Sequence, residues 1–322
     1  MLLKTTTDYQ DYLRTAKHLE FAVLQPHFEA LQADLIVNIF GLDFISNLDT
    51  RYNTSSPSPA LSTEENYLIK LLQKAIASLG FVNAIPSLLI TIQGTGLQQA
   101  GAKPIYEWQK LAIQDQILET GWNAIGAAIK YCWAKRADSK FALWKDSAEE
   151  KISRQFFINS ANEFNNSFQI ARSTRTYEAL KASLKEAHQT IKSVLGDALY
   201  AEIKTQNVSF TISDNNKVLL DNYINDALAQ LTIAIAVFKI ELVFNEEGAR
   251  VVSQPASKST QRAKTQATEQ TKINLSAECS ISGNNYLSEL TQYLKINAET
   301  YPLYVPILND STANATGGCC VL

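Results

Sequence analysis

Three pairs of adjacent carboxylates are the first residues in the sequence that could do acid–base or metal chemistry. They are Glu64/Glu65, Glu149/Glu150 and Glu246/Glu247. Neighbouring side chains on a helix point about 100° apart, so the two members of a pair do not face one substrate. None of the pairs has a histidine nearby in the sequence. We therefore interpret them as first-turn helix charges and as solvated helix faces.

The histidines and cysteines show no spacing typical of a metal site or a nucleophile. They are His18, His27, His188, Cys132, Cys279, Cys319 and Cys320. Without an H-x-x-x-H, H-x-x-C or C-x-x-C pattern, the sequence predicts no zinc site. His27 and His188 lack a partner spaced for a catalytic triad, and we expect both at the surface or at its boundary. The cysteines fit reduced thiols of a cytosolic-type compartment.

A Gly-rich segment, QGTGLQQAG at residues 93–101, stands between an apolar strand and a helix, where a nucleotide-binding turn would lie. Its G-x-G-x-x-x-x-G spacing is neither the dinucleotide fingerprint nor a P-loop, and no Gly-Lys-Ser/Thr follows. The favoured interpretation is a strand-to-helix turn that needs a positive φ.

The tryptophans and the C-terminus each allow a second interpretation. Trp108, Trp122, Trp133 and Trp144 could stack nucleic-acid bases, but packing in a core or a subunit interface is favoured. Cys319-Cys320-Val321-Leu322 fits the C-a-a-X pattern of geranylgeranylation, which would imply a membrane anchor. No polybasic segment precedes this motif, so we favour a polar tail that ends in small residues.

Composition excludes several classes of protein. The chain has 322 residues, 46 % of them apolar, with 29 Lys and Arg against 32 Asp and Glu. It is therefore neither wholly disordered nor a basic nucleic-acid binder. Its N-terminus lacks the basic head and apolar run of a signal peptide. The most apolar stretch, residues 228–244, is too short and too charged to span a bilayer, so we expect a soluble protein.

An internal repeat organises the chain. Residues 24–48 resemble 180–203, with Leu24 on Leu180, Phe28 on Leu184 and, after a one-residue slip, Ile36 on Ile191 and Gly41 on Gly196. Residues 67–96 resemble 219–248, with Ala75 on Ala227, Leu79 on Leu231, Ala84 on Ala236 and Gly96 on Gly248. Residues 122–147 resemble 284–307, where the aromatic anchors are Phe141 and Trp144 in the first copy and Tyr301 and Tyr304 in the second. A distance of about 150 residues indicates two copies of one domain, because solenoid units are far shorter.

The apolar spacing predicts mainly helices. In the first copy we expect helices at 7–14, 21–40, 63–84, 104–134 and 146–168, with a strand at 88–93. In the second we expect helices at 175–195, 215–238 and 285–298, with a strand at 240–244. Each opening repeat block should end in a Gly C-cap, and Ser62 to Glu65 is an N-terminal capping pattern.

The predicted fold is mainly α with short β-strands, in a tandem duplication of a helical-bundle domain. Residues 1–160 form the first domain and residues 161–322 the second. The second carries an almost apolar-free segment at 253–271, which we interpret as an exposed arm, and a flexible C-terminal tail. We predict no catalytic residue, no metal ligand and no cofactor-binding residue.

Several of these segments resemble one family. They are Phe21, Leu24 and Pro26; the run AIASLGFVNAIP at 75–86, which leads toward Gly96; and Trp144 to Ser147. Together they are similar to head–tail connector proteins, also called adaptor or head-completion proteins, of tailed phages in Bacteroidetes. The likeness is best over residues 1–150 and weaker over 170–308, where a counterpart of Pro86 is missing and the polar segment at 253–271 is added.

The resemblance implies a structural virion protein without catalytic residues. Such subunits form a cyclic homo-oligomeric ring of about a dozen copies at the head–tail interface, after synthesis in the host cytoplasm. The ring docks on the portal protein, contacts tail or further connector proteins, and lets packaged double-stranded DNA pass without sequence-specific contact. A near-neutral subunit suits such a channel, because strong phosphate binding would hold the genome back. The alternatives are a non-viral helical scaffold or binding protein, and an enzyme with an unrecognised site.

Overall fold

A computed structural model of the chain describes residues 1–13, 19–89, 92–93, 96–97, 107–240, 242–245, 248–251 and 269–305. Of the predicted arm at 253–271, only the last three residues are among them, and these begin a helix. The C-terminal tail after residue 305, with its C-a-a-X motif, lies outside the described residues.

The first copy is built around two long antiparallel helices, α5 and α6, which a β-hairpin connects. Its elements are α1 (Thr6–Gln10), α2 (Phe21–Leu31), the π-helical turn η2 (Gln32–Ile36), α3 (Val37–Phe40), α4 (Leu42–Asn53), α5 (Thr63–Leu89), β1 (Ile92–Gln93), β2 (Gly96–Leu97), α6 (Glu107–Ala134), the 3-10 turn η3 (Ser139–Phe141), α7 (Ala142–Lys145) and α8 (Ala148–Ser153).

The second copy repeats this plan with α13 and α14 as its long pair. Its elements are α9 (Ala161–Ser167), α10 (Thr174–Leu195), α11 (Asp197–Ser209), α12 (Asp214–Leu219), the π-helical turn η4 (Leu220–Ile224), α13 (Asn225–Ala236), β3 (Leu242–Asn245), β4 (Gly248–Val251) and α14 (Glu269–Ile296). The predicted fold class is confirmed: helices dominate, the strands are short, and the helical unit occurs twice.

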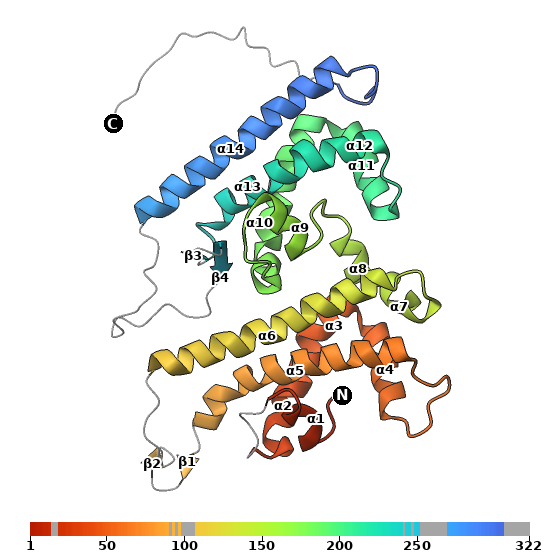
Figure 1. Cartoon of the computed structure of the whole chain (residues 1–322), viewed down its shortest axis with the longest axis vertical. Coiled ribbons are helices and arrows are strands. Elements are labelled where there is room, and N and C mark those ends of the chain that lie inside the picture. Colours follow the sequence, from red (N-terminus) through yellow and green to blue (C-terminus); the bar gives the residue numbers. More distant parts are fainter. Residues whose placement is uncertain are drawn as a thin grey trace.

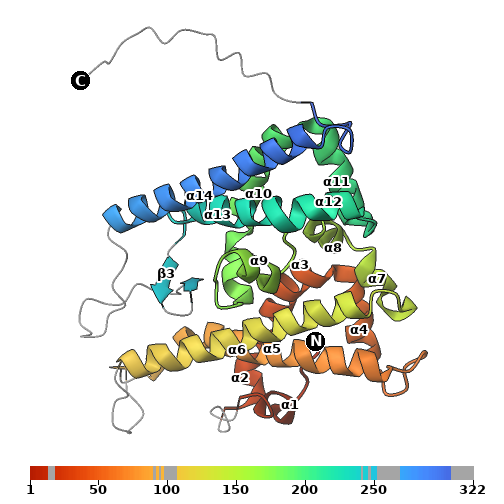
Figure 2. The same ribbon diagram turned by 45° about the horizontal axis from the view of Figure 1, so that its top comes forward.

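The two copies are stacked head to tail along the long axis of the molecule (Figure 1). From one end to the other the order is α1 and α2, then α5 and α6, then α9 and α10, then α13 and α14, and a second view shows the same order (Figure 2). Direct packing links these layers, because α2 contacts α5, α6 contacts α10, and α10 contacts α13. Both hairpins lie at the same side of the stack.

The hairpins correct the interpretation of the Gly-rich segment. Gln93 pairs with Gly96 at the tip of the first hairpin, and Asn245 pairs with Gly248 at the tip of the second. Both strand pairs are antiparallel, so Gln93, Gly96 and Leu97 belong to a hairpin and not to the strand-to-helix turn that the spacing predicted. Residues 98–101 lie outside the described part of the chain.

Several predicted element boundaries were wrong. The helix expected at 146–168 is two helices, α8 and α9, because Ser147 and Ser160 each cap a new N-terminus. The helix expected at 285–298 begins sixteen residues earlier, at Glu269. Its first turn is almost wholly polar, so it lacks the apolar spacing from which the helix was predicted. Of the strand expected at 88–93, residues 88 and 89 belong to α5, which continues through Pro86, and Ile92–Gln93 form a strand; residues 90 and 91 lie outside the described part of the chain. Helices α4 and α11 were not predicted at all.

The two glycines that end the opening repeat blocks occupy corresponding positions in the two copies. Gly41 has φ +89° and Gly196 has φ +78°, which L side chains rarely adopt. Each glycine ends one helix, α3 or α10, and begins the next, α4 or α11. The predicted Gly C-caps are confirmed, and each one turns the chain directly into a further helix.

The one-residue slips between the copies coincide with π-helical turns. Phe28 to Ile36 is one residue longer than Leu184 to Ile191, and the first copy holds η2 within that interval. Conversely, the N-cap Ser213 lies one residue farther from Ala227 than Ser62 lies from Ala75, and here the second copy holds η4. A π-turn accommodates an extra residue without ending the helix, so both helices keep their apolar face in register.

The duplication also reaches the opening helices, which the sequence comparison did not include. Thr5 caps α1 and Ser160 caps α9, and each helix then buries one aromatic ring, Tyr9 or Phe164. The apolar pairs just before these caps are buried too: Leu2 and Leu3 in one copy, Phe157 and Ile158 in the other. The repeat therefore starts at the first residues of each copy. The domain boundary after residue 160 stays a prediction.

Each long helix pair meets at a glycine that faces a leucine. A β-carbon on Gly121 would lie 2.5 Å from Leu79 Cγ, and one on Gly283 would lie 2.8 Å from Leu231 Cγ. Leu79 and Leu231 are partners in the sequence repeat, so the same close approach is made twice. This contact sets the orientation of α6 about its own axis relative to α5, and that of α14 relative to α13.

Each copy has its own hydrophobic core. One core includes residues from Leu2 to Trp144, and the other includes residues from Phe157 to Tyr304. The aromatic anchors Phe141, Trp144, Tyr301 and Tyr304 are all buried. Among the described residues, one helical segment, Thr63–Pro86, is long and apolar enough to cross a membrane, but most of its apolar window is buried as the centre of the first core.

Alanine substitutions at the two capping glycines distinguish the cost of backbone strain from the cost of a steric clash. We expect Gly196→Ala to lower the free energy of unfolding by about 1–3 kcal/mol, because alanine is strained at this φ while nothing lies within 4 Å of the new methyl group. Gly41→Ala should cost more, because its methyl group would also lie 2.9 Å from Ser147 Cβ. Urea denaturation of both variants measures this order, and a neutral Gly196→Ala would contradict it.

Candidate functional site

A groove of about 930 Å³ runs between the two copies. The first copy lines it with residues of α3, α6 and α8, and the second with residues of α9 and α10. At Gly126, helix α6 approaches the second copy so closely that a β-carbon there would lie 2.1 Å from Thr174 Oγ1. Only glycine lets α6 lie this close to the first turn of α10.

The charged side chains of the groove are mostly engaged with neighbours. Lys181 Nζ lies 2.7 Å from Glu178 Oε2 and also faces the Tyr177 ring. Glu163 accepts the backbone N–H of Asn159 at 2.6 Å as part of its capping turn, and desolvation raises the pKa of its carboxyl. The described lining includes no histidine or cysteine. The groove therefore offers shape and polarity rather than an acid–base pair.

A buried charge cluster closes one end of the junction. Glu150, only 2 % exposed, forms ion pairs with Arg154 and with Arg136, the latter at 3.6 Å between Oε1 and Nε. Burial raises the pKa of Glu150, and the two guanidinium groups oppose that rise.

The second copy completes this cluster with Phe210. The guanidinium carbon of Arg136 lies 3.7 Å from the centre of the Phe210 ring, whose edge also meets Trp133 at a centroid distance of 5.2 Å. Phe210 ends α11 with φ +59°, in the left-handed region. A cation over an aromatic face is attracted by the ring quadrupole, more strongly where water is excluded.

Backbone hydrogen bonds hold the same junction. Arg154 Nη1 donates to the carbonyl of Val208 at 2.6 Å. The Asn207 side chain donates to the carbonyls of Arg154 and Phe156, at 2.9 and 2.8 Å. Residues at the end of the first copy are thereby bound to the end of α11. We refer to Arg136, Glu150, Arg154, Asn207 and Phe210 as the junction cluster.

The carboxylate pairs are only partly as predicted. Glu65 and Glu150 do lie in first helical turns, but both are buried, so the interpretation as solvated faces was wrong for them. Glu65 forms an ion pair with Arg51. Desolvation by burial raises the pKa of its carboxyl, but the hydrogen bonds from Arg51 and Ser62 outweigh that effect, so the pKa is lowered. Glu246 and Glu247 lie outside the described residues.

The expectation for His188 was also wrong. His188 is 4 % exposed, and its ring lies beside those of Phe157 and Tyr200. Its Nε2 accepts the Phe157 N–H at 3.4 Å, which places the proton of the neutral ring on Nδ1, 3.1 Å from Tyr200 Oη. Burial lowers the pKa of this ring to about 3. His27 is partly buried, and His18 lies outside the described residues.

The remaining candidates are structural. Trp144 is buried, and Trp122 and Trp133 pack against the first core, which confirms the core interpretation for these three. Cys132 and Cys279 are buried free thiols, and burial raises the pKa of Cys279 to about 11. Within the part of the chain that the structure describes, no group of three His, Cys, Asp or Glu side chains could hold a metal ion.

Comparison with known proteins assigns a family. The profile of DUF6712, a family of unknown function, matches residues 36–154 and again residues 191–311. The chain belongs to this family. The two DUF6712 matches begin at Ile36 and Ile191, which the internal repeat had paired, and they confirm the tandem duplication. No curated protein matches, and no solved structure matches.

From the junction cluster we predict that removal of its carboxylate lowers the free energy of unfolding strongly. Glu150→Gln would leave two guanidinium groups partly buried without a counter-charge, and we expect a loss of about 3–5 kcal/mol in unfolding free energy. Glu186→Gln is the matched control, because Glu186 pairs with Lys239 at the surface, where such pairs contribute about 0–1 kcal/mol. Equal effects of the two substitutions in urea denaturation would contradict a buried cluster.

His188 predicts an acid-sensitive term in stability. Its pKa is about 3 in the folded chain against 6.5 in the unfolded one, so below pH 6.5 the unfolded chain binds the extra proton. The stability that the neutral ring contributes is therefore complete above pH 6.5 and is lost as the pH falls toward 3. In His188→Phe this term is absent. We expect the unfolding free energy of the native chain, relative to His188→Phe, to fall by about 1.4 kcal/mol per pH unit below pH 6. Parallel pH profiles of the two proteins would contradict this.

Proposed function

We propose that this chain is a structural subunit of a tailed-phage head–tail connector, an adaptor ring that docks on the portal and extends the DNA channel. The observation that carries the proposal is the resemblance of residues 1–150 to such proteins. Side chains of that resemblance, such as Leu24 and Trp144, belong to the first core, so the likeness concerns the residues that determine the fold.

The closed cores are compatible with a role in assembly. Each copy has a hydrophobic core of its own, and the groove between the copies has most of its charges engaged with neighbours. A protein of this kind acts through its surfaces and its shape. Its partners would be further copies of the chain, the portal protein, and tail or other connector proteins of the virion.

The charge of the chain suits a DNA channel. A formal net charge of −3 leaves no excess of cations to hold phosphates. Each neutralised phosphate would add a salt-dependent term to affinity, so a strongly basic lining would retain the genome. DNA can then pass without sequence-specific contact.

The groove supports a second candidate function, a helical binding protein outside any virus. Its volume of about 930 Å³ is within the range of small-molecule sites. The two functions differ in what they bind, because a connector needs protein surfaces whereas a binding protein needs a ligand in the groove.

Assembly with a portal protein tests the proposal. The purified chain is mixed with the portal protein encoded in the same genome, and the products are analysed by mass photometry and negative-stain imaging. We expect rings of the chain on the portal, and none on a portal from an unrelated phage. A chain that stays monomeric with its own portal would contradict the proposal, and ligand binding in the groove would then favour the alternative.

A further inference from the structure

Among the described residues, the stacking of the two copies leaves one exposed face at each end of the stack. Within the chain, the outer face of α6 packs against α10 of the second copy and lines the groove together with α9 and α10. The corresponding outer face of α14 is at one end of the stack, and α1 and α2 are at the other (Figures 1 and 2). The intrachain contact joins unlike surfaces, so it is heterologous, and such contacts can continue from chain to chain.

The Gly–Leu contacts define which residues of α14 correspond to the interface of α6. With Gly121 placed on Gly283, the groove residues Asn123, Gly126 and Lys130 fall on Asn285, Ser288 and Gln292. These three residues of α14 are exposed. At Ser288 the small residue of the close approach is retained as serine.

These residues form a continuous stripe on α14. Ile281 and Ile296 extend it at either end, with spacings of three or four residues throughout, so all five share one helix face. The buried residues Cys279, Gly283, Leu287, Leu290 and Leu294 lie on the opposite face. Ile281 is 63 % exposed and Ile296 is 75 % exposed, among the most exposed large apolar side chains of the described chain.

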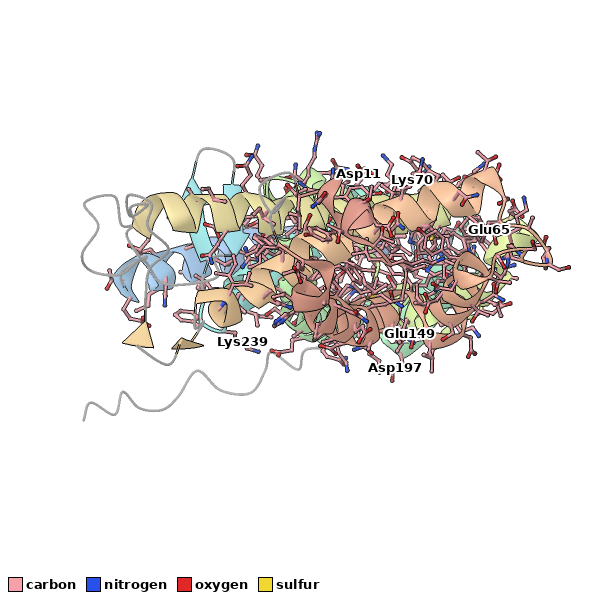
Figure 3. All side chains as sticks on the ribbon, turned by 90° about the horizontal axis from the view of Figure 1, so that it is seen from below. Asp11, Glu65, Lys70, Glu149, Asp197 and Lys239 are labelled. Carbon is pink, nitrogen blue, oxygen red and sulfur yellow. The ribbon has the colours of Figure 1, made fainter. Side chains whose placement is uncertain are left out.

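The opposite end of the stack carries the counterparts of α9 and α10. Ser160 and Glu163 line the groove, and in the repeat they correspond to Thr5 and Asp8 of α1. Likewise Glu178 corresponds to Ala22 of α2. Seen from below, this end presents α1 and α2, with Asp11 labelled at its surface (Figure 3).

Exposed side chains on the two end faces also complement one another. Val23 on α2 is 48 % exposed, and it offers an apolar contact for the isoleucines of the α14 stripe. Lys295 beside the stripe and Asp11 on α1 are exposed charges of opposite sign.

We propose that the α14 stripe of one chain receives α1 and α2 of a second copy of this chain, in the arrangement that α6 makes with α9 and α10. The occupant is a second copy because the same chain already contains this contact once, between corresponding elements. Repetition gives a ring if the rotation per chain closes and a helical filament if it does not. The inference rests on the proposed function insofar as that function needs a ring, and it specifies the surfaces that build it.

Crosslinking between two variants that each carry one added cysteine, beside the buried Cys132 and Cys279, tests the proposed contact. Ser288→Cys and Ala22→Cys are made in a Cys319→Ser, Cys320→Ser background, mixed with each other and with the portal protein that gathers the chains, and treated with a short bis-maleimide. A head-to-tail contact gives crosslinks between position 288 of one chain and position 22 of another, and none between two chains of the same variant. Ser139→Cys, an exposed serine on η3, is the matched control and should give no crosslink with Ala22→Cys.

The oligomeric state separates failure of this inference from failure of the proposed function. If chains form oligomers on sizing, or rings on the portal, but the 288–22 crosslink is missing, the inference is overturned and the connector proposal stands. If no oligomer forms under either condition, both are overturned. In a second measurement, Ser288→Arg should abolish the oligomers while circular dichroism stays that of the native helices. Oligomers that survive Ser288→Arg would also overturn the inference.

Discussion

The close approach of two long helices at a Gly–Leu contact is the constraint on which the rest of each copy depends. Leu79 occupies the space beside Gly121, and Leu231 occupies the space beside Gly283, with no room for a β-carbon in either place. Such a contact allows one rotation of α6 on α5 and of α14 on α13. That rotation decides which side chains enter the core and which face outward, so the outer faces of both copies follow from it.

The junction between the copies depends on a different kind of interaction. The cores are apolar and non-directional, whereas the junction cluster combines a buried carboxylate, two guanidinium groups and an aromatic ring. Burying Glu150 costs desolvation free energy, and the ion pairs offset it only in a narrow geometry. The cluster therefore contributes orientation more than stability. It selects one placement of the second copy on the first, and the groove beside it has its shape for the same reason.

Features that depend on local sequence could be predicted, and features that depend on distant contacts could not. The Gly caps at Gly41 and Gly196 and the long helices follow from apolar spacing and glycine conformation. Helix α14 was predicted too short because its first turns are mostly polar and gain stability from only a few buried residues. The junction cluster joins Arg136 to Phe210, which lie 74 residues apart, and no local pattern links them. His188 looked exposed because its neighbours Phe157 and Tyr200 come from other elements.

The same repeat predicts that contacts between chains are weaker than the contact within a chain. In the proposed chain-to-chain interface, Trp133 is replaced by Lys295 and Phe210 by Ser55, so the ring contact between Trp133 and Phe210 has no counterpart. The α14 stripe is polar at its centre and apolar only at its ends. An interface of this kind binds weakly until several copies are held side by side, because each further contact then forms at high effective concentration. Subunits with such faces stay separate in dilute solution and assemble where a template gathers them, which is the behaviour that a ring on a portal requires.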